Sequence, residues 1–256
     1  MTFAFATLFT HSKRADFSPW ERLNFPNDSN SHKPCETSSQ LIYRDQVTTL
    51  QSAEGLNSLS GRVALVTGAG RGIGASISRT LASAGAGVAL VARTTEELEA
   101  VASEIISLGG RAYAISADLA VAGSASEVVA QTIEELGRVD ILVNNAALQL
   151  FGPVLEFSEE AFRATVDLNL TAPFALAKAV LPDMISRHEG WIVTFASDLA
   201  SRVRTGGAAY CSTKRALLAL SEVLQLEHRA DGIRVSVVLP GITATSWDGH
   251  DPGHPS

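Results

Sequence analysis

The stretch RVALVTGAGRGIG, from Arg62 to Gly74, decides the fold of this 256-residue chain. Its first five residues form a short apolar run, which is typical of a buried β-strand. Ile73, Ile77 and Leu81 then fall four apart, which predicts a helix with one apolar face. Glycines between a strand and a helix let the backbone approach a pyrophosphate closely, and the helix N-terminus offers free N–H groups. The stretch therefore predicts a dinucleotide-binding turn.

The same alternation of strand and helix continues towards the carboxyl end of the chain. We expect further strands at 87–92, 112–117, 140–143, 191–196 and 233–239, and helices that include 125–136, 159–186 and 208–229. Continuous apolar strands of this kind are buried on both faces. The sequence therefore predicts an α/β fold with a Rossmann-type, doubly wound parallel sheet in three αβα layers.

The helix after the second strand has a start signal of its own. Thr94 stands three residues before Glu97, which is the spacing of a capping box. Leu98, Val101 and Ile105 follow on one face, which predicts that this face packs against the sheet.

Outside this region the composition changes. Residues 1–57 are rich in Ser, Asn, Thr and Pro without a sustained period, and are expected to be an irregular N-terminal extension. Residues 58–245 are the expected dinucleotide-binding catalytic domain. Residues 246–256 are expected to be a short polar tail, the start of a truncated substrate loop, with the last strand region missing because Pro and Gly are so dense there.

Composition excludes several classes of function. The net charge of −7 argues against nucleic-acid partners and anionic membrane surfaces. The sequence contains no run of about 18 apolar residues, so it predicts no membrane-spanning segment. Two cysteines, Cys35 and Cys211, are too few for a disulfide framework, so a cytoplasmic location is expected. The alternative is an organellar transit peptide, because the first fifteen residues lack acids, although arginines are scarce there.

The choice of nucleotide depends on the end of the second strand. NAD enzymes usually place Asp or Glu there to bind the adenosine ribose hydroxyls. This chain has Ala92 followed by Arg93, and Arg71 stands inside the glycine-rich turn. Two guanidinium groups without an opposing acid favour the 2′-phosphate of NADP(H) over NAD(H), although each alone could be a solvated surface arginine.

Four polar residues are candidates for catalysis. Tyr210 and Lys214 are four apart near the start of a helix, so they share one face. A neighbouring ammonium stabilises a phenolate, which makes tyrosine a usable proton donor to a carbonyl. Ser197 ends the fifth strand, where an open sheet points towards ligand, and Asn169 interrupts an apolar helix. A satisfied buried amide that bends the helix is the alternative for Asn169.

With these residues in view, the chain resembles the short-chain dehydrogenase/reductase family, and within it the 3-oxoacyl reductase type. The resemblance covers about 185 residues. The family's glycine motif T-G-x-x-x-G-x-G falls on Thr67, Gly68, Gly72 and Gly74, its adenine-side aspartate on Asp118, its N-N-A-G segment on Asn144-Asn145-Ala146 with Ala147 in place of glycine, its tetrad on Asn169, Ser197, Tyr210 and Lys214, and its P-G motif on Pro240-Gly241 followed by Thr245.

The resemblance implies the roles of these residues. Tyr210 would pass the proton, Ser197 would polarise the carbonyl, Lys214 would bind the nicotinamide ribose, and Asn169 would hold a water that links Lys214 to solvent. The residues expected to bind the cofactor are Thr67, Gly68, Gly70, Arg71, Gly72, Ile73, Gly74, Arg93, Asp118, Leu119, Asn145, Ala146, Tyr210, Lys214, Pro240, Gly241 and Thr245.

Two hypotheses of different classes follow. The first is an active NADP(H)-dependent oxidoreductase that interconverts a ketone, such as a 3-oxoacyl group, and a secondary alcohol. The second is a non-catalytic, truncated dinucleotide-binding fragment. A small-molecule carbonyl or alcohol is the expected partner, with a homo-oligomer that would lack the family's usual C-terminal interface. No metal site is expected, since His250 and His254 lie in a polar tail. Asp198 could contact substrate or cap a turn.

Overall fold

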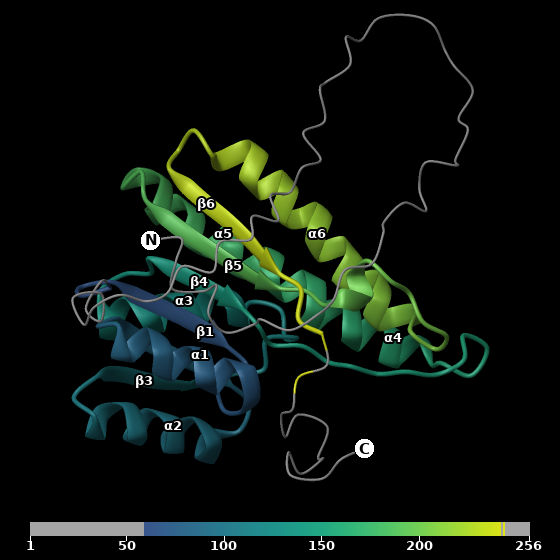
Figure 1. The fold of residues 1–256 in the computed structure, drawn as a ribbon, viewed down its shortest axis with the longest axis horizontal. Helices are drawn as coiled ribbons and strands as arrows, with labels where there is room; N and C mark the ends of the chain where they lie inside the picture. Colours follow the sequence, from purple (N-terminus) through teal and green to yellow (C-terminus); the bar gives the residue numbers. More distant parts are fainter. Residues whose placement is uncertain (1–58, 242, 244–256) are drawn as a thin grey trace, which may run out of the picture. The chain divides into compact units, whose positions relative to one another are not determined.

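One parallel sheet of six strands organises the described part of the chain. The computed structural model describes residues 59–241 and residue 243. The strand order is β3-β2-β1-β4-β5-β6 (Figure 1). Their bounds are Val63–Thr67 for β1, Gly87–Ala92 for β2, Arg111–Ser116 for β3, Ile141–Asn144 for β4, Gly190–Phe195 for β5 and Ile233–Val238 for β6. This order confirms the doubly wound fold and puts its topological switch point between β1 and β4.

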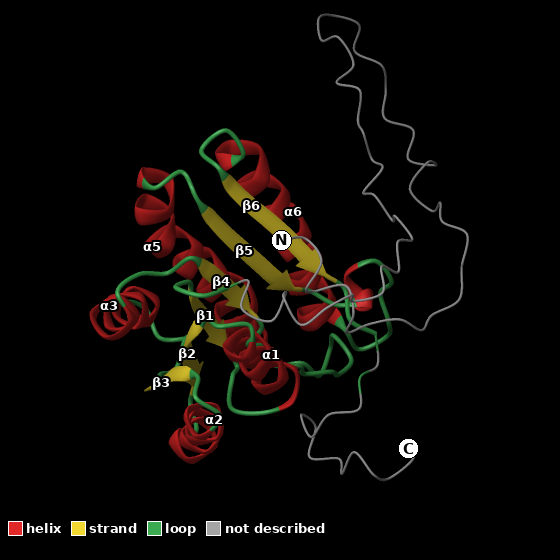
Figure 2. Cartoon of the chain, turned by 60° about the vertical axis from the view of Figure 1, so that its left-hand side comes forward, coloured by secondary structure: helices red, strands yellow, loops and turns green. Residues whose placement is uncertain are grey.

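Helices cover both faces of this sheet, which gives the expected three layers (Figure 2). They are α1 (Gly72–Ser83), α2 (Thr95–Ser107), α3 (Ser124–Leu136), α4 (Glu159–Val166), α5 (Ala172–Ser186) and α6 (Ala208–His228). Each crossover follows its strand directly, so every carboxyl end of a strand opens onto a loop at the same edge of the sheet. No helix within residues 59–241 is long and apolar enough to cross a membrane.

The main core lies between the sheet and the helices α3, α5 and α6. Leu65 of β1, Leu142 of β4 and Ile192 of β5 are fully buried there against Leu176 of α5 and Val128 of α3. On the other face of the sheet, α1 and α2 pack against β1, β2 and β3. Every residue of β1 and β4 is buried, as the sequence pattern predicted for strands that are apolar on both faces. This packing fixes the strand ends from which the polar candidates project.

The predicted helix 159–186 is interrupted in the structure. A π-helical turn, Asp167–Thr171, separates α4 from α5 and contains Asn169. The apolar period alone did not indicate this extra residue in the turn, because a π-turn inserted into a helix keeps the chain helical on both sides. A buried amide that bends the helix was the alternative to a catalytic role for Asn169, and the structure places this buried residue within the π-turn.

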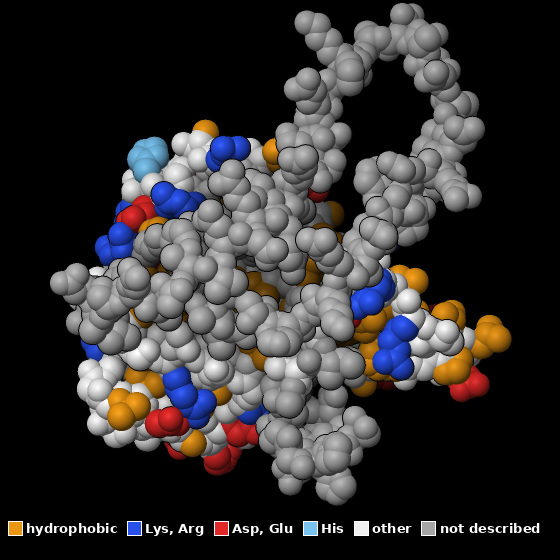
Figure 3. All heavy atoms as spheres, in the orientation of Figure 1, with side chains coloured by type: hydrophobic (Ala, Val, Ile, Leu, Met, Phe, Trp, Pro, Cys, Tyr) orange, Lys and Arg blue, Asp and Glu red, His pale blue; other side chains and the backbone are white. Residues whose placement is uncertain are grey.

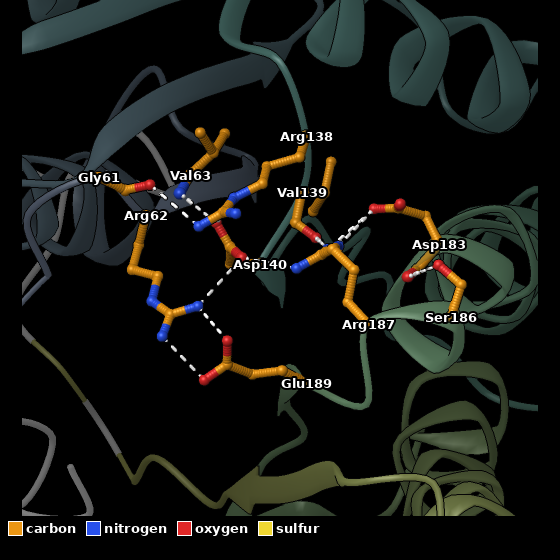
Figure 4. Close-up of polar contacts among 10 residues, drawn as sticks. All are labelled: Gly61, Arg62, Val63, Arg138, Val139, Asp140, Asp183, Ser186, Arg187 and Glu189. Atoms are coloured by element: carbon orange, nitrogen blue, oxygen red, sulfur yellow. Dashed lines mark hydrogen bonds and ion pairs between the residues drawn. The ribbon is translucent and has the colours of Figure 1, made fainter.

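An ion-pair cluster lies at the amino-terminal ends of the strands, away from the carboxyl ends that carry the polar candidates (Figure 4). The carboxylate of Asp140, fully buried just before β4, accepts hydrogen bonds from the backbone N–H of Val63 at 2.8 Å, from Arg138 at 2.9 Å and from Arg187 at 2.9 Å. Arg62 lies 3.5 Å from the same carboxylate and also pairs with Glu189. The hydrogen bonds from Arg62 hold the pKa of Glu189 below its ordinary value.

The predicted N-terminal extension (residues 1–57) and the predicted tail (residues 246–256) lie outside the described residues, as does Thr245. The division of the chain into these segments stays a prediction.

Candidate active site

The turn between β1 and α1 is shaped by glycine. Gly68 has a φ of +65°, in the left-handed region that favours glycine. A methyl group on Gly74 would overlap the carbonyl oxygen of Gly68, so the turn packs directly on the first turn of α1. Arg71, the N-cap residue of α1, makes no side-chain capping bond. The helix N-terminus is therefore open to an anionic group that approaches the backbone closely, and the turn fits a pyrophosphate.

Thr67 and Asn145 join the two strands at the switch point. The hydroxyl of Thr67 accepts hydrogen bonds from the backbone N–H groups of Asn145 at 2.9 Å and Ala146 at 3.0 Å. The amide of Asn145 donates to the carbonyl oxygens of Thr67 at 2.9 Å and Gly68 at 3.3 Å. The side chains of both residues thus hold the glycine-rich turn against the end of β4. This contact gives them a supporting position behind the predicted cofactor site.

An acid opposes one of the two predicted phosphate-binding arginines. Arg71 pairs with Glu97 at 3.7 Å, and Glu97 also packs against Gly70. The expectation of no opposing acid near Arg71 was therefore wrong. So was the predicted capping box, because the Thr94 side chain makes no capping bond and the carboxylate of Glu97 is turned towards Arg71 instead.

The remaining adenosine-side candidates lie at the ends of β2 and β3. The side chain of Arg93 is exposed, and its carbonyl oxygen accepts a hydrogen bond from Ser116 at 3.0 Å. Asp118 is exposed and accepts a hydrogen bond from the backbone N–H of Ala120 at 3.0 Å, whereas Leu119 is buried. Asp118 thus orders its own loop while it remains accessible to a ligand.

Lys214 is a buried cation directly beneath the predicted catalytic tyrosine. Only 2% of Lys214 is exposed, and its ammonium donates a hydrogen bond to the carbonyl oxygen of Phe195, the last residue of β5, at 2.7 Å. The Lys214 Nζ atom lies 5.7 Å from the ring centroid of Tyr210. Burial lowers the pKa of Lys214 to about 7, because the charged form loses its hydration. The two residues share one face of α6, as their spacing predicted.

Ser197 begins the turn that follows β5. Its hydroxyl accepts a hydrogen bond from the backbone N–H of Leu199 at 3.1 Å, and it donates to the carboxylate of Asp198 at 3.2 Å. Asp198 in turn pairs with Arg202 at 2.8 Å, and its backbone N–H donates to the carbonyl oxygen of Pro240 at 3.0 Å. The loops after β5 and β6 therefore meet beside Ser197.

Asn169 links the loop after β4 to α6. Its amide accepts a hydrogen bond from the backbone N–H of Leu148 at 2.7 Å and donates to the carbonyl oxygen of Leu148 at 2.9 Å. It also donates to the hydroxyl of Thr213 at 3.2 Å, and Thr213 donates to the carbonyl oxygen of Tyr210 at 2.9 Å. Asn169 is fully buried, so this chain of bonds fixes the backbone of Tyr210 from inside the protein.

Three residues of the site escaped the sequence analysis. Thr213 relays the contact of Asn169, the ring of Phe151 lies 5.7 Å from that of Tyr210, and Arg204 stacks on Phe151 at 4.4 Å. Phe151 and Arg204 come from irregular loops, where no periodicity marks a residue. Only the fold brings them to the tyrosine.

Comparison with known proteins agrees with this arrangement. The family model described as short chain dehydrogenase matches residues 62–252. L-xylulose reductase of Mesocricetus auratus is 40% identical over 189 residues, which cover 73% of this chain and 74% of that protein.

Solved structures are similar as well. A metagenomic short-chain oxidoreductase in complex with NADP has a TM-score of 0.70 at 40% identity, over 73% of this chain and 85% of that one. The 3-oxoacyl (acyl-carrier-protein) reductase of Agrobacterium tumefaciens C58, with NADP bound, has a TM-score of 0.73 at 31% identity, over 77% of this chain and 76% of that one.

Proposed function

The chain belongs to the short-chain dehydrogenase/reductase family, and we propose that it interconverts a ketone and a secondary alcohol with NADP(H), using Tyr210 as general acid and base. The observation that carries this proposal is the buried ammonium of Lys214, held by the carbonyl of Phe195 beneath the ring of Tyr210. Among the described residues no carboxylate pairs with this buried lysine, which makes its charge costly, and perturbed groups of this kind concentrate at functional sites.

The residues near the strand ends fit the cofactor. The turn from Gly68 to Gly74 with Ile73 would hold the pyrophosphate, Asp118 and Leu119 the adenine, and Arg71 and Arg93 the 2′-phosphate. On the nicotinamide side we assign Ala146, Tyr210 and Lys214, with Pro240, Gly241 and Thr245. Two solved relatives with NADP bound support NADP(H) over NAD(H). When bound, the cofactor supplies or accepts the hydride at the carbonyl carbon.

The protein's own groups would handle the proton. In reduction, the Tyr210 hydroxyl donates its proton to the carbonyl oxygen, and in oxidation the phenolate takes it back. The ammonium of Lys214 favours the phenolate by its positive charge. The Ser197 hydroxyl donates a hydrogen bond to the same substrate oxygen, which requires that it turn away from Asp198.

For Asn169 we propose a positioning role. Both N–H bonds of its amide are already used by Leu148 and Thr213. A water that links Lys214 to solvent would therefore meet the amide oxygen or the main-chain carbonyls that the π-turn releases.

Members of this family are named for different ketone substrates. The relatives named above act on L-xylulose or on a 3-oxoacyl group, according to their names. A 3-oxoacyl substrate is one candidate, and a small polyol-derived ketone is another.

Two measurements test the proposal on the full-length chain. Fluorescence titration should show saturable binding of NADPH that is tighter than binding of NADH. Tyr210→Phe should keep this binding and lose ketone-dependent NADPH oxidation by at least about 100-fold, because general acid catalysis contributes that much. Binding without turnover of any ketone by the unmodified chain would favour the non-catalytic alternative, and unchanged turnover in Tyr210→Phe would remove Tyr210 from the mechanism.

A further inference from the structure

Two loops meet over the ring of Tyr210. One follows β4 and contains Phe151 and Gly152, and the other follows β5 and contains Arg204 and Gly206. The backbone N–H of Gly152 donates a hydrogen bond to the carbonyl oxygen of Gly206 at 2.9 Å. Both loops extend from the carboxyl ends of parallel strands, where ligands of doubly wound sheets bind. Their contact fixes the position of the side chains that each contributes.

The side chains of Arg204, Phe151 and Tyr210 contact one another in series. The ring of Phe151 packs against that of Tyr210 with a tilt of 58° and 5.7 Å between centroids. The guanidinium of Arg204 lies 4.4 Å from the centroid of Phe151. One aromatic ring therefore separates a positive charge from the predicted proton donor.

The charge of Arg204 is not neutralised within residues 59–241. Its neighbour Arg202 forms an ion pair with Asp198 at 2.8 Å, whereas no carboxylate of the described residues lies within ion-pair distance of Arg204. A cation above a ring keeps the N–H donors at the edge of its plane free. Arg204 is also exposed, so these donors are accessible to a ligand.

The backbone and the guanidinium of Arg204 each make a contact that positions them. The carbonyl oxygen of Arg204 accepts a hydrogen bond from the backbone N–H of Gly207 at 3.1 Å, and the guanidinium lies 4.4 Å from the ring centroid of Phe151. Because this turn leads directly into α6, the guanidinium is positioned by the same helix that carries Tyr210. A pre-organised arginine loses little conformational entropy when it binds.

We infer that Arg204, held over Phe151, recognises a carboxylate on the substrate, so that the substrate is a keto acid or the corresponding hydroxy acid. The inference rests on the proposed function. The intervening ring places the carboxylate several bonds from the reacting carbon. In the space-filling view, basic side chains lie among hydrophobic ones at the edge of the molecule where Figure 1 places α4 (Figure 3). The side chains of Val154, Leu155 and Val203, from the same two loops, are exposed, and such apolar neighbours suit an apolar acid.

The number of charges favours a carboxylate over a phosphate. Within the described part of these two loops, Arg202 is already paired with Asp198, which leaves the guanidinium of Arg204, with two parallel N–H donors, for one planar monoanion. A phosphate dianion would leave charge and lone pairs without partners in this part of the site.

The test compares keto acids with their methyl esters, using 4-acetylbenzoate and 4-oxopentanoate as probes with NADPH. The full-length chain should reduce at least one acid with a kcat/KM about tenfold or more above that of its ester, as expected for a hydrogen-bonded charge pair. Arg204→Gln should raise KM for that acid about tenfold and change KM for the ester less than twofold. Arg204→Lys should recover part of the loss, because it keeps the charge without the planar fork.

Arg234→Gln is the matched control. Arg234 also stacks on an aromatic ring, 5.1 Å from the centroid of Trp191, but it lies at the start of β6, at the opposite edge of the sheet. It should leave the ratio of acid to ester unchanged. Equal reduction of acid and ester, or an equal loss of both in Arg204→Gln, would overturn the inference while the proposed function stands.

If no ketone is reduced, that result counts against the proposed function and not against the carboxylate site. A binding measurement then tests the carboxylate site directly. Benzoate is titrated calorimetrically into the NADP⁺-saturated chain and into Arg204→Gln. Binding weakened about tenfold in the variant supports the carboxylate site, and equal or absent binding overturns it.

Discussion

The ammonium of Lys214 donates a 2.7 Å hydrogen bond to the carbonyl oxygen of Phe195, the last residue of β5. This bond ties the helix of the predicted proton donor to the central sheet and leaves a positive charge almost without hydration. The protein therefore places an ionisable amine where burial disfavours its charged form. Its cost and its use can be measured separately.

Lys214→Met should change how stability depends on pH. In the folded protein the pKa of Lys214 is about 7, and in the unfolded chain it returns to about 10.5. Between these values the unfolded state binds more protons, so the free energy of unfolding rises with pH. From pH 7 to pH 9, Lys214 should raise the free energy of unfolding of the unmodified chain by about 2 kcal/mol. The variant has no such group and should lack this increase.

Urea denaturation of the apoprotein at both pH values gives this difference. Lys178→Met serves as the control, because Lys178 is exposed and water solvates its ammonium. Its pH profile should run parallel to that of the unmodified chain. If Lys214→Met also runs parallel, then Lys214 is charged and solvated in the folded protein.

Glu97→Gln should strengthen the binding of NADPH. The carboxylate of Glu97 lies 3.7 Å from Arg71, so it competes with a 2′-phosphate for that guanidinium. The pair is half exposed and worth about 0.2–1 kcal/mol, which corresponds to a fall of about 1.4- to fivefold in the Kd of NADPH. The Kd of NADH should stay the same, because NADH has no 2′-phosphate.

Fluorescence titration in low and high salt measures both dissociation constants. Glu96→Gln removes a neighbouring acid from the same first turn of α2 and should have a smaller effect. The gain in Glu97→Gln should shrink at high salt, where exposed charges are screened. An equal gain for NADPH and NADH would assign Glu97 to the pyrophosphate side instead.

Gly74→Ala should weaken both nucleotides together. A methyl group at this position would overlap the carbonyl oxygen of Gly68 and lie 2.7 Å from the amide nitrogen of Asn145, so the turn must move away from α1. We expect a loss of at least about tenfold in the affinity for NADPH and for NADH, because the pyrophosphate approach is common to both. Ser76→Ala, on the exposed side of the same helix, should bind normally. Tight binding by a folded Gly74→Ala protein would show that the turn is not the phosphate site.

The fold could be predicted from the sequence because its signals are local. Apolar runs such as 87–92 and 191–196 marked buried strands to within about a residue, and parallel strands require helical crossovers. The candidates Ser197, Tyr210 and Lys214 followed from strand ends and helical spacing.

The features that could not be predicted from the sequence depend on contacts between residues far apart in the chain. Glu97 has the spacing of a capping box, but its nearest partner in space is Arg71, from another helix. Phe151 and Arg204 lie more than fifty residues apart in loops without a period, and those loops are joined by the hydrogen bond between Gly152 and Gly206 and by the contact of Arg204 with Phe151. Interactions of this kind have no sequence signature.

Asp140→Asn should destabilise the fold more than any surface change. The carboxylate of Asp140 is fully buried and compensates Arg138 and Arg187, with Arg62 close by. An amide of the same shape leaves these guanidinium groups facing a neutral group that also presents N–H donors. Breaking a buried ion pair costs about 3–5 kcal/mol. Because the arginines are partly exposed, we expect the free energy of unfolding to fall by about 3 kcal/mol, at the lower end of this range.

Asp183→Asn is the control for this variant. Asp183 pairs with the same Arg187 at 2.8 Å, but 44% of its side chain is exposed, so its loss should cost less than about 1 kcal/mol. Urea denaturation at neutral pH compares the free energies of unfolding, and NADPH titration of the folded variants reports on the distant nucleotide site. Because the cluster lies at the amino-terminal edge of the sheet and the glycine turn at the carboxyl-terminal edge, Asp140→Asn should bind NADPH normally while it remains folded. Equal losses of stability in the two variants would show that burial does not make Asp140 special, and a selective loss of NADPH affinity would show that the two edges of the sheet are coupled.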